Sequence, residues 1–481
     1  MANLSAVLPL AAANGARPTP ADPADASRWA LTRAYRRLIA GDWHADLEGR
    51  IRQQISHVRR DAWGTLDTSR NLFRAVWDAL AVSYVRTPAV HGEGTADLAA
   101  AVDAAGYWAL MAGAGERDLY ALRDLLVRVD VTPTGELTHR LVYPDCIVAT
   151  PDPRVPHRAI AIAECVQRVD PRTGKPVWVW DVVDVIDPER PVMQVRSADY
   201  RDDLTEAHLG ATFEGDAYPY RRADGTPVLP YAFGHARRRS CLWGPGENRE
   251  LYVGTLEVGC KYTFLGHIQR SASWPQRYAV GAAPAGAAYA DDDGDGKGRK
   301  VVDADPANVI VMESLEGFEG QPVIGQWQNA ADPVAHIEAI GRYERGLIAT
   351  APGVSSADIQ RMSGDPRSGY AISLSREAQR EQQRQQEPQL RELDTAVLEL
   401  SAVLLNRATG SNHPESGYRV EYRAIPPSAE EKKTQREHLT GMLDLGLVDV
   451  VAAYQELHPG TSRADAEAAL LRIRAANASF R

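Results

Sequence analysis

The sequence is poor in cysteine, and its few cysteines do not stand at metal-ligand spacing. Cys146, Cys165, Cys241 and Cys260 are scattered over 481 residues, and no two of them form a C-x-x-C pair. The short ligand spacing of a zinc site is therefore absent. Scattered cysteines are typical of core residues in a reducing cytoplasm, so the pattern predicts no disulfide framework.

Long apolar runs are also missing. No segment reaches the roughly 18 uninterrupted apolar residues that a membrane helix needs. Residues 4–13 are apolar, but no basic segment precedes them and Pro9 interrupts them, which favours a flexible Ala/Pro-rich arm over a signal peptide. We therefore expect a soluble protein.

The chain has no basic excess. It carries 64 acidic and 54 basic residues, for a formal net charge of −10. Proteins that grip nucleic acid by neutralising phosphates usually carry a basic surplus or a basic stripe. The balance argues against tight nucleic-acid binding. It is compatible with a surface past which DNA slides, because acidic walls repel phosphate.

Signatures of catalysis are absent as well. The sequence contains no G-x-S-x-G, H-E-x-x-H, G-x-x-x-x-G-K-[ST] or G-x-G-x-x-G motif. The segment HGEG at 91–94 has no identifiable nucleophile partner, and the twelve histidines are scattered. These absences predict that the chain is not an enzyme and that it binds no cofactor. A glycosidase-type pair of carboxylates is an alternative that the sequence leaves open.

The chain divides into helical, extended and again helical parts. Its length predicts about three domains or subdomains. Residues 1–27 lack periodicity and indicate an arm. Apolar spacing then predicts helices, while alternation and turn signals predict a β-meander or a pair of hairpins, followed by an extended segment. The predicted helices are 28–57, 71–84 and 96–126; the meander or hairpin pair is 127–195 and the extended segment 218–230.

Two further helices and one long helix follow. Helical spacing covers 250–273 and 331–351, with strand-like pieces at 309–312 and 322–326 between them. The long helix begins near Ser375, and residues 376–389 consist almost wholly of Arg, Glu and Gln, with a pair such as Glu381–Arg384 at helical spacing. Pro388 predicts a kink. The residues beyond it form an apolar seam that must pack against a partner: Leu390, Leu393, Val397, Leu400 and Leu404.

The C-terminal part predicts a compact helical unit. Ser428 and Glu431 form a capping box, and Gly446 ends the helix that begins there. Two short helices, 448–457 and 462–476, follow.

An ordered set of segments resembles the portal proteins of tailed bacteriophages. The run at 426–473, which contains HLTGMLDLGLVDVV, resembles the end of that family, and SGYAISLSREAQR at 368–380 resembles the start of its long crossing helix. YRRLIAGD at 35–42, NLFRAVWDALAVSYVRTP at 71–88 and YPD at 143–145 agree more weakly. The resemblance spans roughly 28–475 and implies an α+β, mostly helical fold.

The resemblance also implies a division into parts. It implies a β-rich wing, a helical stem, a small clip and a helical crown. The implied segments are a flexible arm (1–27), the wing (28–249), stem helices (250–277 and 331–352), the clip (278–330), a tunnel loop (353–373), a long kinked crossing helix (374–408), and a connecting strand with the crown (409–481). An acidic, glycine-rich insert at 290–300 does not match the family.

The function that the resemblance implies is structural. The chain would form a homo-oligomeric ring, most often a dodecamer, at one capsid vertex of the virion, assembled in the host cytoplasm. The implied partners are a packaging terminase, a head-tail adaptor, a major capsid or scaffold protein, and double-stranded DNA that passes without sequence-specific binding during packaging and ejection. The implied channel residues are Ser355, Arg361, Asp365, Arg367, Arg376, Arg380 and Arg384.

Two alternative functions stay open: a hydrolase with an αβ core and a helical C-terminal domain, and another phage structural protein, such as a capsid or baseplate component. The unbroken Gln/Arg/Glu run at 379–387 beside a leucine seam favours the ring subunit, because a monomeric enzyme has little use for it.

Two charged clusters have both a functional and a structural interpretation. Asp291, Asp293 and Asp295, followed by Gly296, occupy the spacing of an EF-hand loop, but Val302 stands where the bidentate Glu belongs. A solvated acidic loop is the competing interpretation of a Ca²⁺ site. The run 237–239 of three arginines either contacts DNA or a neighbouring subunit, or is a solvated surface triplet, which we favour.

Overall fold

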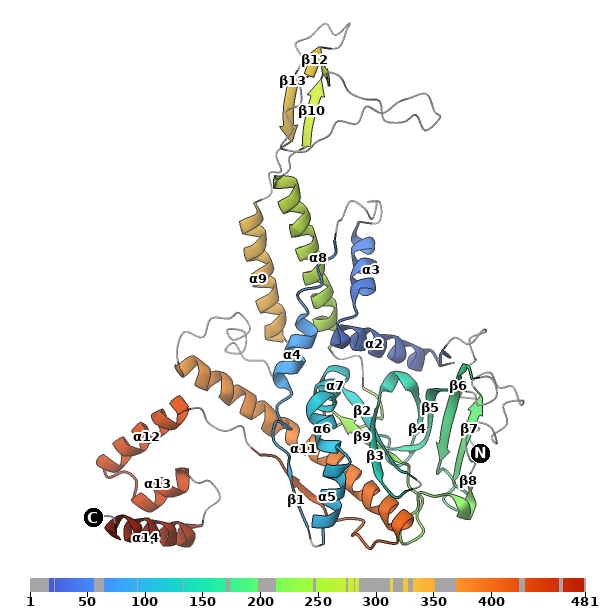
Figure 1. Cartoon of the computed structure of the whole chain (residues 1–481), viewed down its shortest axis with the longest axis vertical. Coiled ribbons are helices and arrows are strands. Elements are labelled where there is room, and N and C mark those ends of the chain that lie inside the picture. Colours follow the sequence, from blue (N-terminus) through green and yellow to red (C-terminus); the bar gives the residue numbers. More distant parts are fainter. Residues whose placement is uncertain are drawn as a thin grey trace.

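The structure is a computed structural model that combines helices and antiparallel sheets, so the chain is an α+β protein (Figure 1). The residues that it describes are 17–20, 22–55, 65–92, 94–132, 134–169, 174–197, 213–244, 248–273, 276–280, 282–284, 312–314, 323–327, 332–350, 369–423, 429–457 and 462–479.

The first helices pack their aromatic side chains into the core. α2 (Pro23–Ala40) starts at an N-cap, Asp22, whose side chain accepts from the Ala24 N–H, and it ends at Gly41, which adopts a φ of 83°. α3 (His44–Gln54) follows. α4 (Leu72–Leu80) is shorter than predicted. It ends at Leu80 because the next free N–H groups, at Ser83 and Tyr84, donate to the buried carboxylate of Glu116.

The third predicted helical region is broken into pieces, as its glycines suggested. α5 (Ala96–Ala104), α6 (Tyr107–Leu110), a π-helical turn (Met111–Gly115) and α7 (Glu116–Leu122) follow one another. A Cβ on Gly115 would lie 2.4 Å from the Met111 sulfur, so a larger residue there would force the buried Met111 side chain to move. The region ends at Leu122 rather than Leu126, because residue 124 already begins a strand.

The predicted meander or pair of hairpins is a hairpin followed by a meander, and the two belong to different sheets. The first has the order β3-β2-β9, from β2 (Asp124–Val131), β3 (Leu137–Val142) and β9 (Tyr231–His235). The second is a true antiparallel meander: β4 (Ile147–Pro151), β5 (Ala159–Val169), β6 (Pro176–Asp184), β7 (Val192–Ser197) and β8 (Phe213–Glu214). A 3-10 turn, Pro144–Cys146, separates the sheets. The extended segment near 218–230 turns at Gly225.

A helical hairpin projects from this body (Figure 1). α8 (Arg249–Ser273) runs away from the body and α9 (Pro333–Thr350) returns beside it, close to the predicted bounds. Short antiparallel pairs lie at its far end. β10 (Gln276–Val280) pairs with β13 (Val323–Trp327), and β11 (Ala282–Pro284) pairs with β12 (Met312–Ser314).

α11 (Gly369–Thr409) is the longest helix and begins earlier than predicted. It continues through Pro388, because the loss of one backbone hydrogen bond is outweighed by the burial of the residues beyond it. β14 (Arg419–Glu421) then pairs with β1 (Ala89–His91), which joins the end of this helix to the N-terminal helices.

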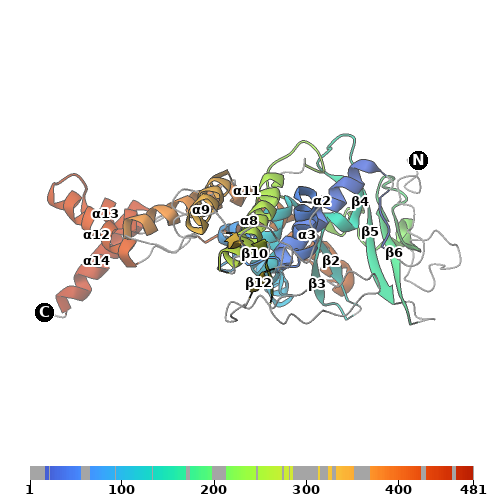
Figure 2. The same cartoon turned by 90° about the horizontal axis from the view of Figure 1, so that it is seen from above.

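The chain closes in a three-helix unit that lies apart from the body (Figures 1 and 2). Its helices are α12 (Ala429–Asp444), α13 (Val450–Leu457) and α14 (Arg463–Ser479), near the predicted bounds. Gly446 has a φ of 69°, and the N–H of Leu447 donates to the Met442 carbonyl, which is the predicted helix stop. Ser428 of the predicted capping box lies outside the described residues.

The cysteines and the apolar character of the helices also bear on the sequence predictions. All four cysteines carry free thiols. Over the ranges that the structure describes, no helix combines the length and the apolar character needed to cross a bilayer.

Candidate functional site

The predicted seam of α11 lies in the core. Leu390, Leu393, Val397, Leu400 and Leu404 are all buried. The helix packs on β9 and β2, and the contact is close: a Cβ on Gly234 of β9 would lie 2.8 Å from a methyl group of Leu393. The sheet therefore provides the surface against which the seam packs.

A buried carboxyl group, which sequence analysis missed, anchors the same helix. Asp394 is fully buried, and its side chain accepts hydrogen bonds from three tyrosyl hydroxyls. Tyr107 donates at 2.6 Å, Tyr84 at 2.9 Å and Tyr422 at 2.5 Å. Burial raises the pKa of Asp394 to about 7, while the three hydroxyls partly oppose the rise. We call Asp394 and these tyrosines the tyrosine cage.

A second buried acid lies near the tyrosine cage. Glu116 on α7 accepts from the backbone N–H of Ser83 at 3.0 Å and from the Tyr120 hydroxyl at 2.9 Å. Burial raises the pKa of Glu116 even though these donors oppose the rise. The negative charge of Glu116 adds to the rise of the pKa at Asp394. Both acids act as hydrogen-bond acceptors that tie α11, α7 and the loop after α4 together.

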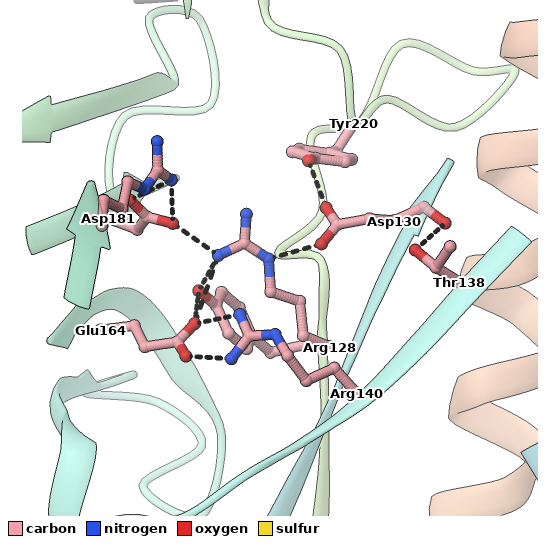
Figure 3. A network of polar contacts seen from close by, with 9 residues as sticks. Arg128, Asp130, Thr138, Arg140, Glu164, Asp181 and Tyr220 are labelled. Carbon is pink, nitrogen blue, oxygen red and sulfur yellow. Dashed lines mark hydrogen bonds and ion pairs between the residues drawn. The ribbon is translucent and has the colours of Figure 1, made fainter. Parts of the chain in front are cut away.

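An ionic cluster joins the two sheets (Figure 3). Arg128 of β2 contacts Asp181 of β6 at 2.9 Å, Glu164 of β5 at 3.2 Å and Asp130 of its own strand at 2.8 Å. Arg140 of β3 binds Glu164 with both terminal nitrogens. Burial disfavours the charged form of Arg128, but the surrounding Tyr231 and carboxylates outweigh it and raise its pKa.

A cavity of about 520 Å³ opens over this ionic cluster. Its charged lining consists of three arginines (Arg128, Arg140 and Arg168) and three carboxylates (Asp130, Glu164 and Asp181). The lining therefore carries no net charge with which to select an ionic ligand. Its groups already pair with one another across the sheets, so the arrangement supports a structural joint between them.

The polar half of α11 is only partly exposed. Arg384 is exposed and pairs with Glu381 at 3.8 Å, as its spacing predicted. Gln383 and Gln386 are buried, which the sequence did not indicate, and Gln383 donates to the Arg423 carbonyl at 3.4 Å. Arg376 and Arg380 lie in α11, but their side chains are outside the description. The predicted channel residues Ser355, Arg361, Asp365 and Arg367 lie outside the described residues.

The helical hairpin exposes apolar side chains on one helix. α9 buries Ile340 and Ile348, and its Leu347 approaches Gly254 of α8 so closely that a Cβ there would lie 2.4 Å away. On the same apolar stripe, nearer the start of α9, Val334 is 63% and Ile337 46% exposed. The start of this stripe is therefore not covered by the described part of the chain.

The structure describes the arginine run at 237–239 but not the acidic loop at 290–300, so it tests the prediction only for the first. The prediction of a solvated triplet is wrong for Arg239, whose side chain is 7% exposed and contacts Asp124 at 3.0 Å. Arg237 and Arg238 are both exposed, in agreement with the prediction. The candidate Ca²⁺ ligands Asp291, Asp293 and Asp295 lie outside the described residues. Within the described ranges, no group of three or more His, Cys, Asp or Glu is placed to hold a metal ion.

One histidine–serine contact bears on the hydrolase alternative. His139 Nε2 lies 3.2 Å from the hydroxyl of Ser401, but Ser401 is fully buried and donates to the Val397 carbonyl. Burial lowers the pKa of His139 to about 4. This pair is positioned inside the core, where a substrate does not reach it.

No protein-family model matches this chain, and no curated protein matches it.

Proposed function

We propose that the chain is the subunit of a phage portal ring, which sits at one capsid vertex and forms the channel for DNA packaging and ejection. The observation that carries the proposal is the projecting α8–α9 hairpin with apolar side chains open to solvent at Val334 and Ile337. Such side chains call for a neighbouring surface. In a ring, each hairpin lies beside the equivalent hairpin of the next subunit.

The arrangement of the other elements supports the same function. In this proposal α8 and α9 are the stem, and the strands β10–β13 at its far end are part of the clip that binds the terminase during packaging and the adaptor afterwards. α11 is the crossing helix, and α12–α14 are the crown on the side of the capsid or scaffold protein. The net charge of −10 suits a channel that lets DNA pass without holding it.

Assembly of the full-length protein is the first test. We expect native mass spectrometry and negative-stain microscopy to show closed cyclic oligomers. Placing charges on α9 with Val334→Glu and Ile337→Glu should prevent ring closure while leaving the circular dichroism spectrum unchanged. Val169→Glu is a matched control, because Val169 is 67% exposed but lies at the end of β5 in the wing. A monomer under all assembly conditions would contradict the proposal.

DNA passage is the second test. Deleting part of residues 355–367 should leave ring formation intact and abolish DNA packaging or retention in an infection assay. The hydrolase alternative predicts no DNA phenotype for this deletion. If packaging is normal with the shortened segment, the assignment of a tunnel loop to these residues is wrong.

A further inference from the structure

The three-helix unit α12–α14 has too small a core of its own. Among its described side chains, only Leu439, Ala453 and Ala466 are buried, and two of these are alanines. The same unit carries six of the twelve exposed large apolar side chains in the described part of the chain. A unit of this size normally needs a disulfide, a metal or a partner to be stable. Its apolar surface therefore calls for a partner.

The exposed apolar residues of the unit form two surfaces of opposite charge. The first, which we call the acidic corner, lies between α12 and α13; it consists of Asp444, Leu445, Leu447, Asp449 and Val450. The second, the basic strip, lies on α14; it consists of Leu471, Arg472, Ile473 and Arg474. Leu445 is 74% and Leu471 66% exposed. The two surfaces complement each other in charge.

Asp444 in the acidic corner and both arginines of the basic strip are available for a partner. Asp449 pairs with Arg463 at 3.0 Å, but no ion pair joins Asp444, Arg472 or Arg474 to another described residue. Residues 471–475 are all exposed. Five consecutive exposed positions cover more than one helical turn, so this turn of α14 is open to solvent on every side among the described side chains.

We propose that the basic strip of one subunit packs into the acidic corner of the next, so that the crowns of neighbouring subunits are joined head to tail. This inference rests on the proposed ring. In Figures 1 and 2 the three-helix unit lies to one side of the body. In the proposed ring, rotation about the ring axis would place the three-helix units of neighbouring subunits at the same level along that axis. Two different surfaces on each subunit form a heterologous contact, which is the type that closes a ring.

Charge reversal in the full-length protein tests the contact. Asp444→Arg alone and Arg474→Glu alone should each raise the subunit concentration at half-assembly roughly tenfold, measured by sedimentation. The two changes in one chain should restore assembly to near the wild-type concentration, because the pair is regenerated with reversed charges. Asp97→Arg, at an exposed position on α5, is the matched control and should have no effect.

Mixing experiments test the direction of the contact. Leu447→Glu damages the acidic corner and Leu471→Glu damages the basic strip, so each variant alone should assemble only at higher concentration, through the hairpin contact. In an equal mixture the intact strip of one variant meets the intact corner of the other, so mixed dimers should form at a lower concentration than dimers of either variant alone.

The possible outcomes separate this inference from the proposed ring. If wild-type rings form and every crown variant assembles like wild type, the inference is wrong and the ring stands. The same holds if the single reversals weaken assembly but the double reversal does not restore it, or if the mixture forms dimers at no lower concentration than either variant alone. If the wild type itself forms no ring, the proposed function fails and this inference fails with it.

Discussion

Replacing Asp394 by asparagine would remove the one ionisable carboxyl group of the tyrosine cage while keeping its shape. The asparagine side chain still offers a carbonyl oxygen to the tyrosyl hydroxyls, and its amide can donate to one of them. Wild-type Asp394 binds a proton more tightly in the folded protein than in the unfolded chain, because burial disfavours its charge. The folded state is therefore favoured at low pH and loses stability as the pH rises.

The magnitude follows from the rise of the Asp394 pKa from 3.8 to about 7. Above the folded value, the ionised carboxyl lowers the free energy of unfolding by on the order of 4 kcal/mol relative to acidic solution. Of this, on the order of 2–3 kcal/mol is lost between about pH 5 and pH 8. Asparagine does not ionise, so the free energy of unfolding of Asp394→Asn lacks this decrease. Between pH 5 and pH 8 the wild type should therefore lose on the order of 2–3 kcal/mol more stability than the variant.

Urea unfolding followed by tryptophan fluorescence at pH 5 and pH 8 measures the difference. Comparing the two proteins at each pH cancels the titration of all other groups. Tyr422→Phe removes one donor to the carboxylate and should cost about 1–3 kcal/mol, more at pH 8 than at pH 5. Equal pH dependence of the wild type and Asp394→Asn would refute the reasoning.

Three further substitutions test the packing of the body and the hairpin. Arg128→Met removes the buried cation between Glu164 and Asp181, which keep only their more exposed partners Arg140 and Arg168, and it should lower the free energy of unfolding by about 1–3 kcal/mol; no loss in urea titration would argue against a joint between the sheets. Val397→Ala leaves a cavity in the seam and should cost about 2–4 kcal/mol by the same assay, with a lower yield of rings. Gly254→Val overpacks the hairpin against Leu347 and should lower the melting temperature, with Leu347→Ala in the same chain restoring part of it. Gly266→Ala, on the open side of α8, should be neutral or stabilising, and equal effects at both glycines would contradict the close contact.

The helices of the hairpin, of α11 and of the C-terminal unit were predictable from the sequence within a few residues. Apolar spacing of three and four residues is a local signal, and it identified Leu390, Leu393 and Val397 as side chains that must be covered. The helix stop at Gly446 was predictable for the same reason, because a left-handed residue after a helix strongly favours glycine. The prediction that the long helix continues past Pro388 is confirmed, because the residues beyond the proline are buried, and the kink at Pro388 stays a prediction.

The division of the strands into two sheets was decided by tertiary structure. β2 pairs on one side with β3, which follows it, and on the other with β9, about a hundred residues later. Alternation of polar and apolar residues shows that a segment is a strand, but it does not specify the second neighbour. Tertiary structure also decided the ionic cluster. Arg128 contacts Glu164 and Asp181 only because the two sheets lie next to each other at that point.

By itself, the sequence determined which segments are helical, which face of α11 is apolar, and that the chain carries an acidic surplus. Tertiary structure decided which side chains share the core: Tyr84 and Asp394 are 310 positions apart and lie within hydrogen-bond distance. No local sequence signal indicates that Asp394 is buried, because the hydrogen-bond donors that offset the cost of its burial come from three distant segments. The physical reason is range: backbone propensity acts over a few residues, whereas burial of a charged group depends on every element packed around it.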